Sequence, residues 1–210
     1  MLDILYEDEN IVVVNKPVGM LSISDTEGED SAYSILCEHY GHSVYILHRL
    51  DRAVGGVLAF AKNKDAAAHL SRMIAERDGV RKEYLAVCSD FTVDEAGVLE
   101  DILFKDSRTN KVFVVKTQRK GARVARLSYE RIAHKEGMHL IRVLLETGRT
   151  HQVRVQFSHR KMPLCGDGKY GSREKCAIAL FSHRIEFEYP KGRKITAQAM
   201  PKGYPFDLFV

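Results

Sequence analysis

Short runs rich in β-branched and aromatic residues recur along the whole chain, and they constrain its fold more than any other feature. Each run is long enough for one strand and is bounded by turn-forming residues. The predicted strands are residues 11–15, 44–46, 57–61, 83–88, 112–117, 123–132, 139–146, 178–181, 184–189 and 194–197. The segment 190–192 between the last two predicts a hairpin turn, because proline fixes one backbone angle and glycine accepts the unusual one.

Three helices are also predicted. Ser31 can cap a helix over residues 32–40. Asp65 can cap a second helix, in which the apolar residues between 66 and 74 follow the spacing i, i+4, i+7, i+8.

The third predicted helix follows Gly148 and Arg149, with Thr150 as its N-cap. Beyond the cap, Val153 and Phe157 share one face of the helix, while His151 and Arg154 share another. This spacing predicts an apolar side that packs and a polar side that faces a cleft.

Few helices among many strands of mixed length indicate an α+β fold with a large mixed, mostly antiparallel sheet and flanking helices. Alternating βαβ units are not indicated. The chain has 210 residues, without repeats or low-complexity linkers, so we expect one domain over residues 1–210.

Composition excludes several classes of protein. Hydrophobic residues make up 45% and charged residues 29% of the chain, as in a globular protein. No apolar run approaches the roughly 18–20 residues that cross a membrane, and the first ten residues carry four acids and no base, unlike a signal peptide. The four cysteines form no C-x-x-C pair, so no zinc site is indicated. We therefore expect a cytoplasmic protein, and a monomer.

Charge is distributed unevenly along the chain. Residues 1–30 hold eight acids and one base, whereas residues 105–126 hold eight bases and one acid. Lys116, Arg119, Lys120 and Arg123 lie in this basic stretch and are suited to phosphate oxygens. A solvated basic face is the alternative interpretation, and on this stretch alone it is the better one.

Common catalytic motifs are absent: the chain has no G-x-G-x-x-G, P-loop, H-E-x-x-H or G-x-S-x-G. Instead the segment His48-Arg49-Leu50-Asp51 is followed by Gly55-Gly56 and an apolar strand. An aspartate on a loop that enters a buried strand can act as a reacting carboxylate. An ordinary loop salt bridge explains these residues equally well on their own.

Four further segments favour a reacting carboxylate over an ordinary loop salt bridge. They are NKPVG at 15–19, RKEYLAV at 81–87, ETGRTHQVRV at 146–155 and GDGKYG at 166–171. In this order and rough spacing, together with HRLD at 48–51, they resemble the pseudouridine synthases of the ribosomal large-subunit type A family. The resemblance covers nearly the whole chain.

The resemblance implies a catalytic domain whose sheet is split by an RNA-binding cleft, and it implies no metal or organic cofactor. It places the nucleophilic aspartate at Asp51, the aromatic residue that stacks on the target base at Tyr84, and the arginine that pairs with the aspartate at Arg154. The small RNA-binding domain that often precedes this catalytic domain is not expected here, so RNA is the expected partner of the catalytic domain's own surface. A half-buried core aromatic is the alternative for Tyr84.

The same segments supply candidate RNA-binding residues. They are His48, Arg49, Arg149, His151 and Gln152, together with the basic stretch above. His48 and Arg49 can instead fix the catalytic loop, and the two interpretations are evenly balanced. His151 and Gln152 can instead cap or pack. One departure from the family pattern follows the aspartate, where residues 52–56 read Arg-Ala-Val-Gly-Gly in place of a Thr-Ser-Gly run.

Two rival functions remain open at this point. The altered loop at residues 52–56 permits a catalytically silent RNA-binding protein that keeps the synthase fold. A glycoside hydrolase is the second rival, but that class needs two carboxylates that flank one bond. Its only candidate partner for Asp51 is Asp167, which the family resemblance explains better.

Overall fold

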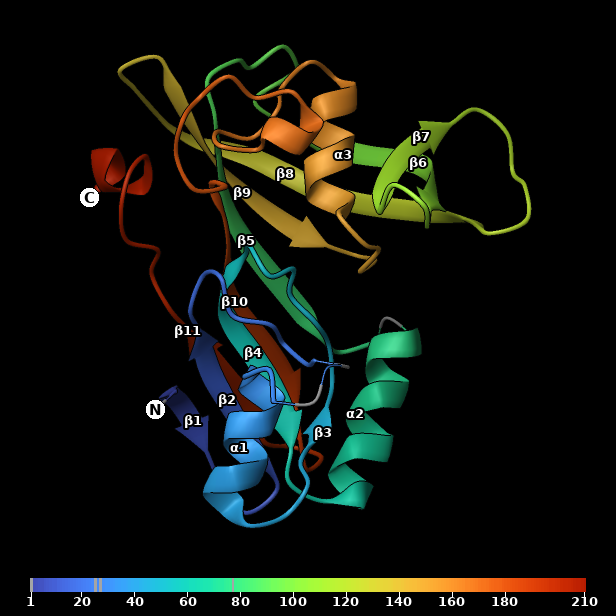
Figure 1. Ribbon diagram of the computed structural model, residues 1–210, viewed down its shortest axis with the longest axis vertical. Helices are drawn as coiled ribbons and strands as arrows, with labels where there is room; N and C mark the ends of the chain where they lie inside the picture. The colour runs from blue at the N-terminus through green and yellow to red at the C-terminus, as the bar shows by residue number, and fades with distance from the viewer. Residues whose placement is uncertain (1, 25, 27, 77) are drawn as a thin grey trace. The chain divides into compact units, whose positions relative to one another are not determined.

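A computed structural model describes residues 2–24, 26, 28–76 and 78–210 of the chain. Its backbone divides into two compact units. The first consists of Met1–Lys82 and Phe181–Pro201, and the second of Glu83–Leu180 and Lys202–Val210. Both units combine strands with helical segments, which confirms the predicted α+β class (Figure 1). The assignment of residues 1–210 to a single domain stays a prediction.

The first unit is built on a mixed set of strands. They are β1 (Asp3–Glu7), β2 (Ile11–Lys16), β3 (Tyr45–Ile46), β4 (Gly55–Ala61), β10 (Leu180–Glu188) and β11 (Lys194–Gln198). They run in the order β1-β2-β4-β10, with β3 paired to β4 and β11 paired to β10. β4 and β10 are parallel, while the other pairs of this unit are antiparallel. The predicted mixed, mostly antiparallel pairing is therefore confirmed.

The helices α1 (Ala32–Tyr40) and α2 (Lys64–Glu76) belong to this unit. Ser31 caps α1 as predicted, because its hydroxyl accepts a hydrogen bond of 3.1 Å from the backbone N–H of Ser34. The predicted cap of α2 is wrong. Asn63 takes that position instead of Asp65, and its side-chain oxygen accepts from the backbone N–H of Ala66 at 2.9 Å.

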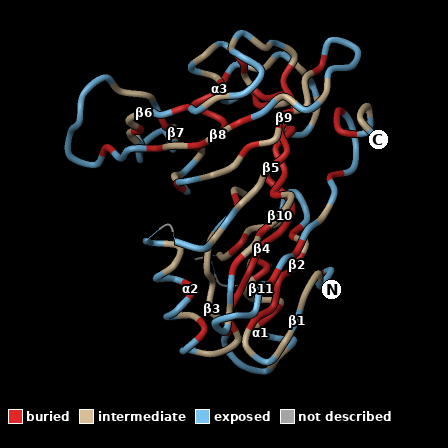
Figure 2. Tube along the Cα trace, turned by 180° about the vertical axis from the view of Figure 1, so that it is seen from behind, coloured by how far each residue is buried: buried red, intermediate tan, exposed pale blue. Residues whose placement is uncertain are grey.

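The core of the first unit lies between α2 and the strands. Leu70 of α2 packs with a cluster from β2, β4, β10 and β11 that includes Val13, Ala59, Ile185 and Ala197. Every residue of β4 is buried, and the buried positions gather on β2, β4 and β10 (Figure 2). A strand that is buried along its whole length gives the loop before it a fixed end.

The hairpin predicted at residues 190–192 is confirmed. β10 and β11 pair antiparallel, and Gly192 in the turn has a φ of +86°. The two strands predicted at 178–181 and 184–189 are instead one strand, β10. Ser182 continues that strand although it is polar, because its hydroxyl donates to the carbonyl of Val57 at 3.0 Å.

The second unit contains five strands in the order β5-β9-β8-β6-β7. They are β5 (Arg81–Cys88), β6 (Ala96–Asp106), β7 (Lys111–Val115), β8 (Ala122–Lys135) and β9 (Met138–Leu145). β6 was not predicted, because its apolar and acidic residues do not alternate strictly. It forms because β7 and β8 pair with it on both sides.

Helix α3 (Gln152–His159) packs on the strands of the second unit (Figure 1). Val155 joins a core cluster with Leu103, Val112, Ala125 and Tyr170. Tyr170 belongs to the short helix η1 (Gly168–Tyr170), and a second short helix, η2 (Phe206–Phe209), lies near the end of the chain. Within the part of the chain that the structure describes, no helix is long and apolar enough to span a membrane.

Candidate active site

The loop that carries Asp51 is held by hydrogen bonds within the first unit. The backbone N–H and carbonyl of Leu50 both bond to the hydroxyl of the buried Ser22, at 2.9 and 3.0 Å. Immediately after Leu50, a tight turn is closed by the bond from Val54 N–H to the carbonyl of Asp51 at 2.9 Å. Arg52 in this turn exchanges two hydrogen bonds with Gly19. The backbone on either side of the Asp51 carboxylate is therefore fixed.

The two glycines after this turn serve strand pairing. Gly56 has a φ of +111°, and a Cβ there would lie 2.1 Å from the carbonyl oxygen of Ser182 on β10. Gly55 pairs with Phe181 and Gly56 with Ser182 in the parallel register of β4 and β10. A side chain at Gly56 would therefore separate the two strands, which explains Gly56 within the departure at residues 52–56.

A buried lysine lies in the same unit. Lys16 at the end of β2 is fully buried, and its ammonium donates to the carbonyls of Pro17 at 3.0 Å and Met20 at 2.7 Å. Burial lowers the pKa of Lys16 to about 8, and the charge of Asp51 opposes that shift. The sequence interpretation missed Lys16 as a residue near Asp51, although the segment 15–19 contained it.

His48 fixes the backbone of the first unit. Its Nε2 accepts a hydrogen bond of 3.2 Å from the backbone N–H of Ala59 on β4. Burial and, to a smaller extent, the positive charge of Lys82 lower the pKa of His48 to about 3. A neutral imidazole is therefore expected at physiological pH, and this favours the loop-fixing interpretation of His48. Arg49 beside it is exposed.

In the second unit, Tyr84 lies on β5 and is buried. Arg154 on α3 is also buried, and it forms a bidentate ion pair with Asp167. Its Nε lies 2.7 Å from Oδ2 and an Nη lies 2.9 Å from Oδ1. The guanidinium also lies over the ring of Tyr170, at 5.2 Å from the centroid.

Asp167 is the partner that the sequence interpretation missed for Arg154. The available signal was its place between two glycines in the segment 166–171, three residues before Tyr170. The pairing of Arg154 with Asp51 that the resemblance implies stays a prediction.

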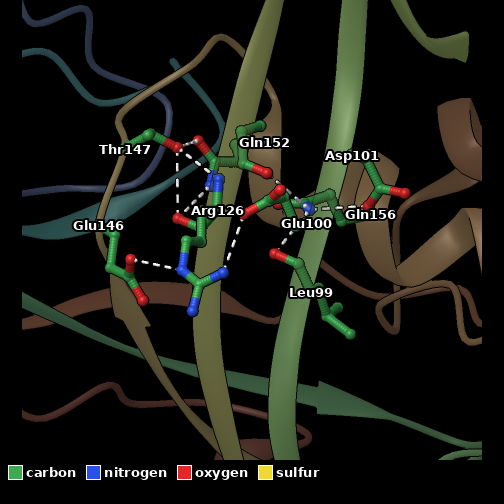
Figure 3. Close-up of polar contacts among 9 residues, drawn as sticks. Leu99, Glu100, Asp101, Arg126, Glu146, Thr147, Gln152 and Gln156 are labelled. Carbon is green, nitrogen blue, oxygen red and sulfur yellow. Dashed lines mark hydrogen bonds and ion pairs between the residues drawn. The ribbon is translucent and has the colours of Figure 1, made fainter.

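The turn before α3 is fixed by Gln152, which is 3% exposed. Its side-chain oxygen accepts from the hydroxyl of Thr147 at 2.6 Å and from the N–H of Arg149 at 3.0 Å. Its amide nitrogen donates to the carbonyl of Arg126 at 3.1 Å (Figure 3). Gln152 thus holds the loop in place, and its contact with RNA stays a prediction.

The predicted N-cap of α3 is wrong by one residue. His151 occupies the cap with a left-handed backbone at φ 51°, and its side chain does not cap the helix. Its Nδ1 lies 2.8 Å from the hydroxyl of Tyr170 instead. Thr150 is not needed as a cap, because Gln152 already orders the preceding turn from within the helix.

The predicted basic residues lie on strand ends and loops of the second unit. Lys116, Arg119 and Lys120 precede β8, Arg123 lies near its start, and all four are exposed. Arg149 is half-buried and donates from Nε to the carbonyl of Val124 at 3.1 Å. Among residues 2–24, 26, 28–76 and 78–210, no carboxylate forms an ion pair with those four exposed bases.

Arg126 differs from its basic neighbours. Its guanidinium lies 2.8 Å from Glu100 and 2.7 Å from Glu146, so two carboxylates flank it (Figure 3). The described residues contain no group of three or more His, Cys, Asp and Glu side chains placed to hold a metal ion.

Comparison with known proteins matches the part of the chain that contains these site residues. A family model described as RNA pseudouridylate synthase matches residues 10–159. An uncharacterized RNA pseudouridine synthase of Mycoplasma pneumoniae, the MG209 homolog, is 33% identical over 198 residues, which cover 90% of this chain and 63% of the relative. The tRNA pseudouridine synthase C of Haemophilus ducreyi is 32% identical over 95% of this chain and 90% of its own length.

A further relative and two solved structures are also similar to this chain. Ribosomal large subunit pseudouridine synthase D of Borreliella burgdorferi is 29% identical, and the alignment covers 90% of this chain and 61% of the relative. Human RNA pseudouridylate synthase domain containing 1 superposes with a TM-score of 0.81 at 22% identity, over 99% of this chain and 86% of that one. Human RNA pseudouridylate synthase domain containing 4 superposes with a TM-score of 0.79 at 23% identity, over 98% of this chain and 90% of that one. At these identities the two structures show the fold.

We expect the Arg154–Asp167 pair to be essential for stability. Arg154→Ala and Asp167→Ala should each lower the free energy of unfolding by about 3–5 kcal/mol, because each leaves a buried charge without its partner. The double variant should lose less than the sum, since no unpaired charge remains. Urea denaturation of all three proteins measures this, and additive losses would contradict it. Arg108→Ala is the control, because its side chain is 94% exposed and its ion pair with Asp106 contributes at most about 1 kcal/mol.

The lowered pKa of His48 predicts a pH dependence of stability. The folded state binds the proton less tightly than the unfolded state, so the contribution of His48 is complete above about pH 6.5 and decreases as the pH falls towards 3. His48→Gln keeps an acceptor for Ala59 but cannot titrate. Denaturation at pH 7 and pH 5 should show that wild type loses more stability than the variant, by up to about 1.4 kcal/mol per pH unit below 6.5. Equal losses would refute this.

Proposed function

Because the chain belongs to the RNA pseudouridylate synthase family, we propose that it converts a uridine of a structured RNA into pseudouridine. The family match over residues 10–159 carries the proposal, since that span includes Asp51, Tyr84 and Arg154. The names of two relatives refer to transfer RNA and to the ribosomal large subunit. One of these two RNA classes is the proposed substrate.

Asp51 is the proposed nucleophile. The isomerisation breaks the N1–C1′ bond of uridine, turns the base while it stays bound, and forms a C5–C1′ bond. A carboxylate can attack C1′ of the ribose as the N1–C1′ bond breaks, and so hold the sugar while the base turns. The ester then breaks as C5 bonds to C1′, C5 loses its proton and N1 is protonated. The hydrogen bonds of Leu50 to Ser22 and of Val54 to Asp51 support this role, because they restrict the backbone that aims the carboxylate.

Tyr84 and Arg154 take the supporting roles in this proposal. A uridine that leaves its helix loses stacking, and the ring of Tyr84 can replace it. The orientation of the Arg154 guanidinium is set by two bonds to Asp167, and a fixed positive charge favours an ionised carboxylate in a catalytic site. Arg154→Lys should therefore be a poor substitute, because an ammonium cannot reproduce bidentate pairing.

RNA binding is proposed for exposed and half-buried polar residues of both units. Arg49 and the four exposed bases near the start of β8 can contact phosphates, and Arg149 and His151 lie on the turn before α3. We propose action in the cytoplasm by a monomer, which cell fractionation and gel filtration test directly. Particulate localisation or a stable dimer would overturn these two points.

Replacement of the proposed nucleophile should abolish turnover. Asp51→Asn removes the negative charge but little volume, so we expect no detectable pseudouridine and nearly unchanged RNA binding. The substrate is RNA extracted from cells that lack the protein, and pseudouridine mapping before and after incubation measures the product. Asp65→Asn, the same change at an exposed position of α2, is the control and should be fully active. Substantial turnover by Asp51→Asn would eliminate that residue as the nucleophile.

The same mapping separates the enzyme from a silent RNA-binding protein. A silent protein would leave the RNA of deficient cells unchanged, with wild type and Asp51→Asn alike. Sites that disappear in deficient cells and return after incubation with wild type support the enzyme.

The exposed bases at the start of β8 should contribute to RNA affinity through phosphates. Each phosphate contact contributes a slope of about −0.7 to −0.9 in log K against log salt concentration. Changing Arg119, Lys120 and Arg123 together to glutamine should weaken binding to many RNAs and flatten the slope by roughly two to three units. Binding titrations at several salt concentrations measure both quantities.

A triple variant elsewhere serves as the control for charge in general. Lys64, Lys191 and Lys202 are exposed and lie away from the start of β8 in the sequence. Their change to glutamine should alter the slope by less than one unit. If both triple variants behave alike, the basic stretch is an ordinary solvated surface.

A further inference from the structure

One face of the sheet in the second unit is not covered by α3. Leu103 and Ala125 point to the α3 side, where they join the core cluster. Residues that alternate with them point the other way, and Phe113 and Val124 are 42% and 43% exposed. Phe104 on β6 lies opposite Phe113 on β7 and Ala122 on β8. Two phenylalanine side chains therefore project from paired positions on this face of the sheet.

Arg119 folds back onto one of these rings. Its guanidinium carbon lies 3.8 Å from the centroid of Phe104, which is van der Waals contact. The loop is turned for this contact by Gly121, whose φ is +84°, and by the bond from Ala122 N–H to the carbonyl of Arg119 at 2.9 Å. Gln118 adds a bond of 3.1 Å to the carbonyl of Ala122. Backbone and ring together restrict the position of the Arg119 guanidinium.

The surroundings of this stack are positive. Lys116, Lys120 and Arg123 are exposed on the same loop and strand end. In the ranges that the structure describes, none of them has a carboxylate partner, whereas Arg126 further along β8 has two. The ammonium of Lys111 lies 5.8 Å from the centroid of Phe113. An anionic ligand with flat rings matches both features of this face.

We propose that the Arg119–Phe104 stack, with Phe113 beside it, binds an unpaired nucleotide of the RNA substrate. The base stacks on the guanidinium or on the exposed Phe113 ring, and the neighbouring phosphates contact Lys120 and Arg123. Stacking on a fixed guanidinium is a common way to hold splayed-out RNA bases, and it needs the planar group of arginine and not only its charge. The inference rests on the proposed function, because it says how the same RNA is bound at a nucleotide other than the reacting uridine.

The closing experiment separates stacking from charge. The probe is an RNA stem–loop with 2-aminopurine in its unpaired loop, and a fully paired duplex of equal length is the second ligand. Arg119→Lys keeps the charge, so a phosphate contact alone predicts unchanged affinity and unchanged 2-aminopurine quenching. Stacking predicts an affinity for the stem–loop about tenfold lower, weaker quenching, an unchanged salt slope and unchanged affinity for the duplex.

Arg72→Lys is the matched control, since it makes the same change at an exposed arginine of α2 that makes no ring contact in the described structure. It should bind both RNAs as wild type does. Phe104→Leu removes the ring under Arg119 and should weaken stem–loop binding in the same way. If Phe104→Leu fails to fold, the surface variant Arg119→Lys still decides the question.

The outcomes distinguish this inference from the proposed function. Wild-type binding and quenching by Arg119→Lys would overturn the stack, whatever Asp51→Asn does. If Arg119→Lys changed self-association and left RNA binding unchanged, that result would also overturn the stack. It would assign the face to contacts between copies of this chain. If Asp51→Asn kept full turnover while Arg119→Lys lost stem–loop affinity, the stack would stand and the proposed catalytic role would fail.

Discussion

The second unit depends on one buried ion pair. Six consecutive residues at the start of α3 are buried, and one of them is Arg154. A charged side chain is tolerated there only with a partner that satisfies both its charge and its donors. Asp167 does both with its two oxygens. The pair therefore joins α3 to the segment that contains Tyr170, whose hydroxyl in turn accepts from the backbone of Val112 on β7 at 3.0 Å.

Buried polar side chains continue this arrangement along α3. Gln152 fixes the preceding turn through Thr147 and Arg149, and one turn later Gln156 donates to the carboxylate of Asp101 at 2.8 Å. Most of the polar residues in the sequence segment 146–155 are thus occupied within the protein. A site built on such a segment is preorganised, because its side chains cannot rearrange without leaving buried polar groups unsatisfied.

Buried and exposed basic side chains differ in their surroundings. Burial lowers the pKa of Lys16 and of His48, and both groups bond to the backbone of the first unit. Lys120 and Arg123 remain exposed without a carboxylate partner among the described residues. This division suits a protein whose interior positions a carboxylate and whose surface attracts a polyanion.

The sequence by itself determined the α+β class, the cap of α1 at Ser31, the hairpin at 190–192 and the family, because these depend on local backbone preferences and on short motifs. It did not determine β6, which exists through its neighbours β7 and β8. Nor did it determine that Gly56 is required by the backbone of Ser182, or that Asp167 is the partner of Arg154. These features depend on residues far apart in the chain, or on different elements, and only the tertiary structure brings such groups within the few ångströms over which hydrogen bonds and steric contacts act.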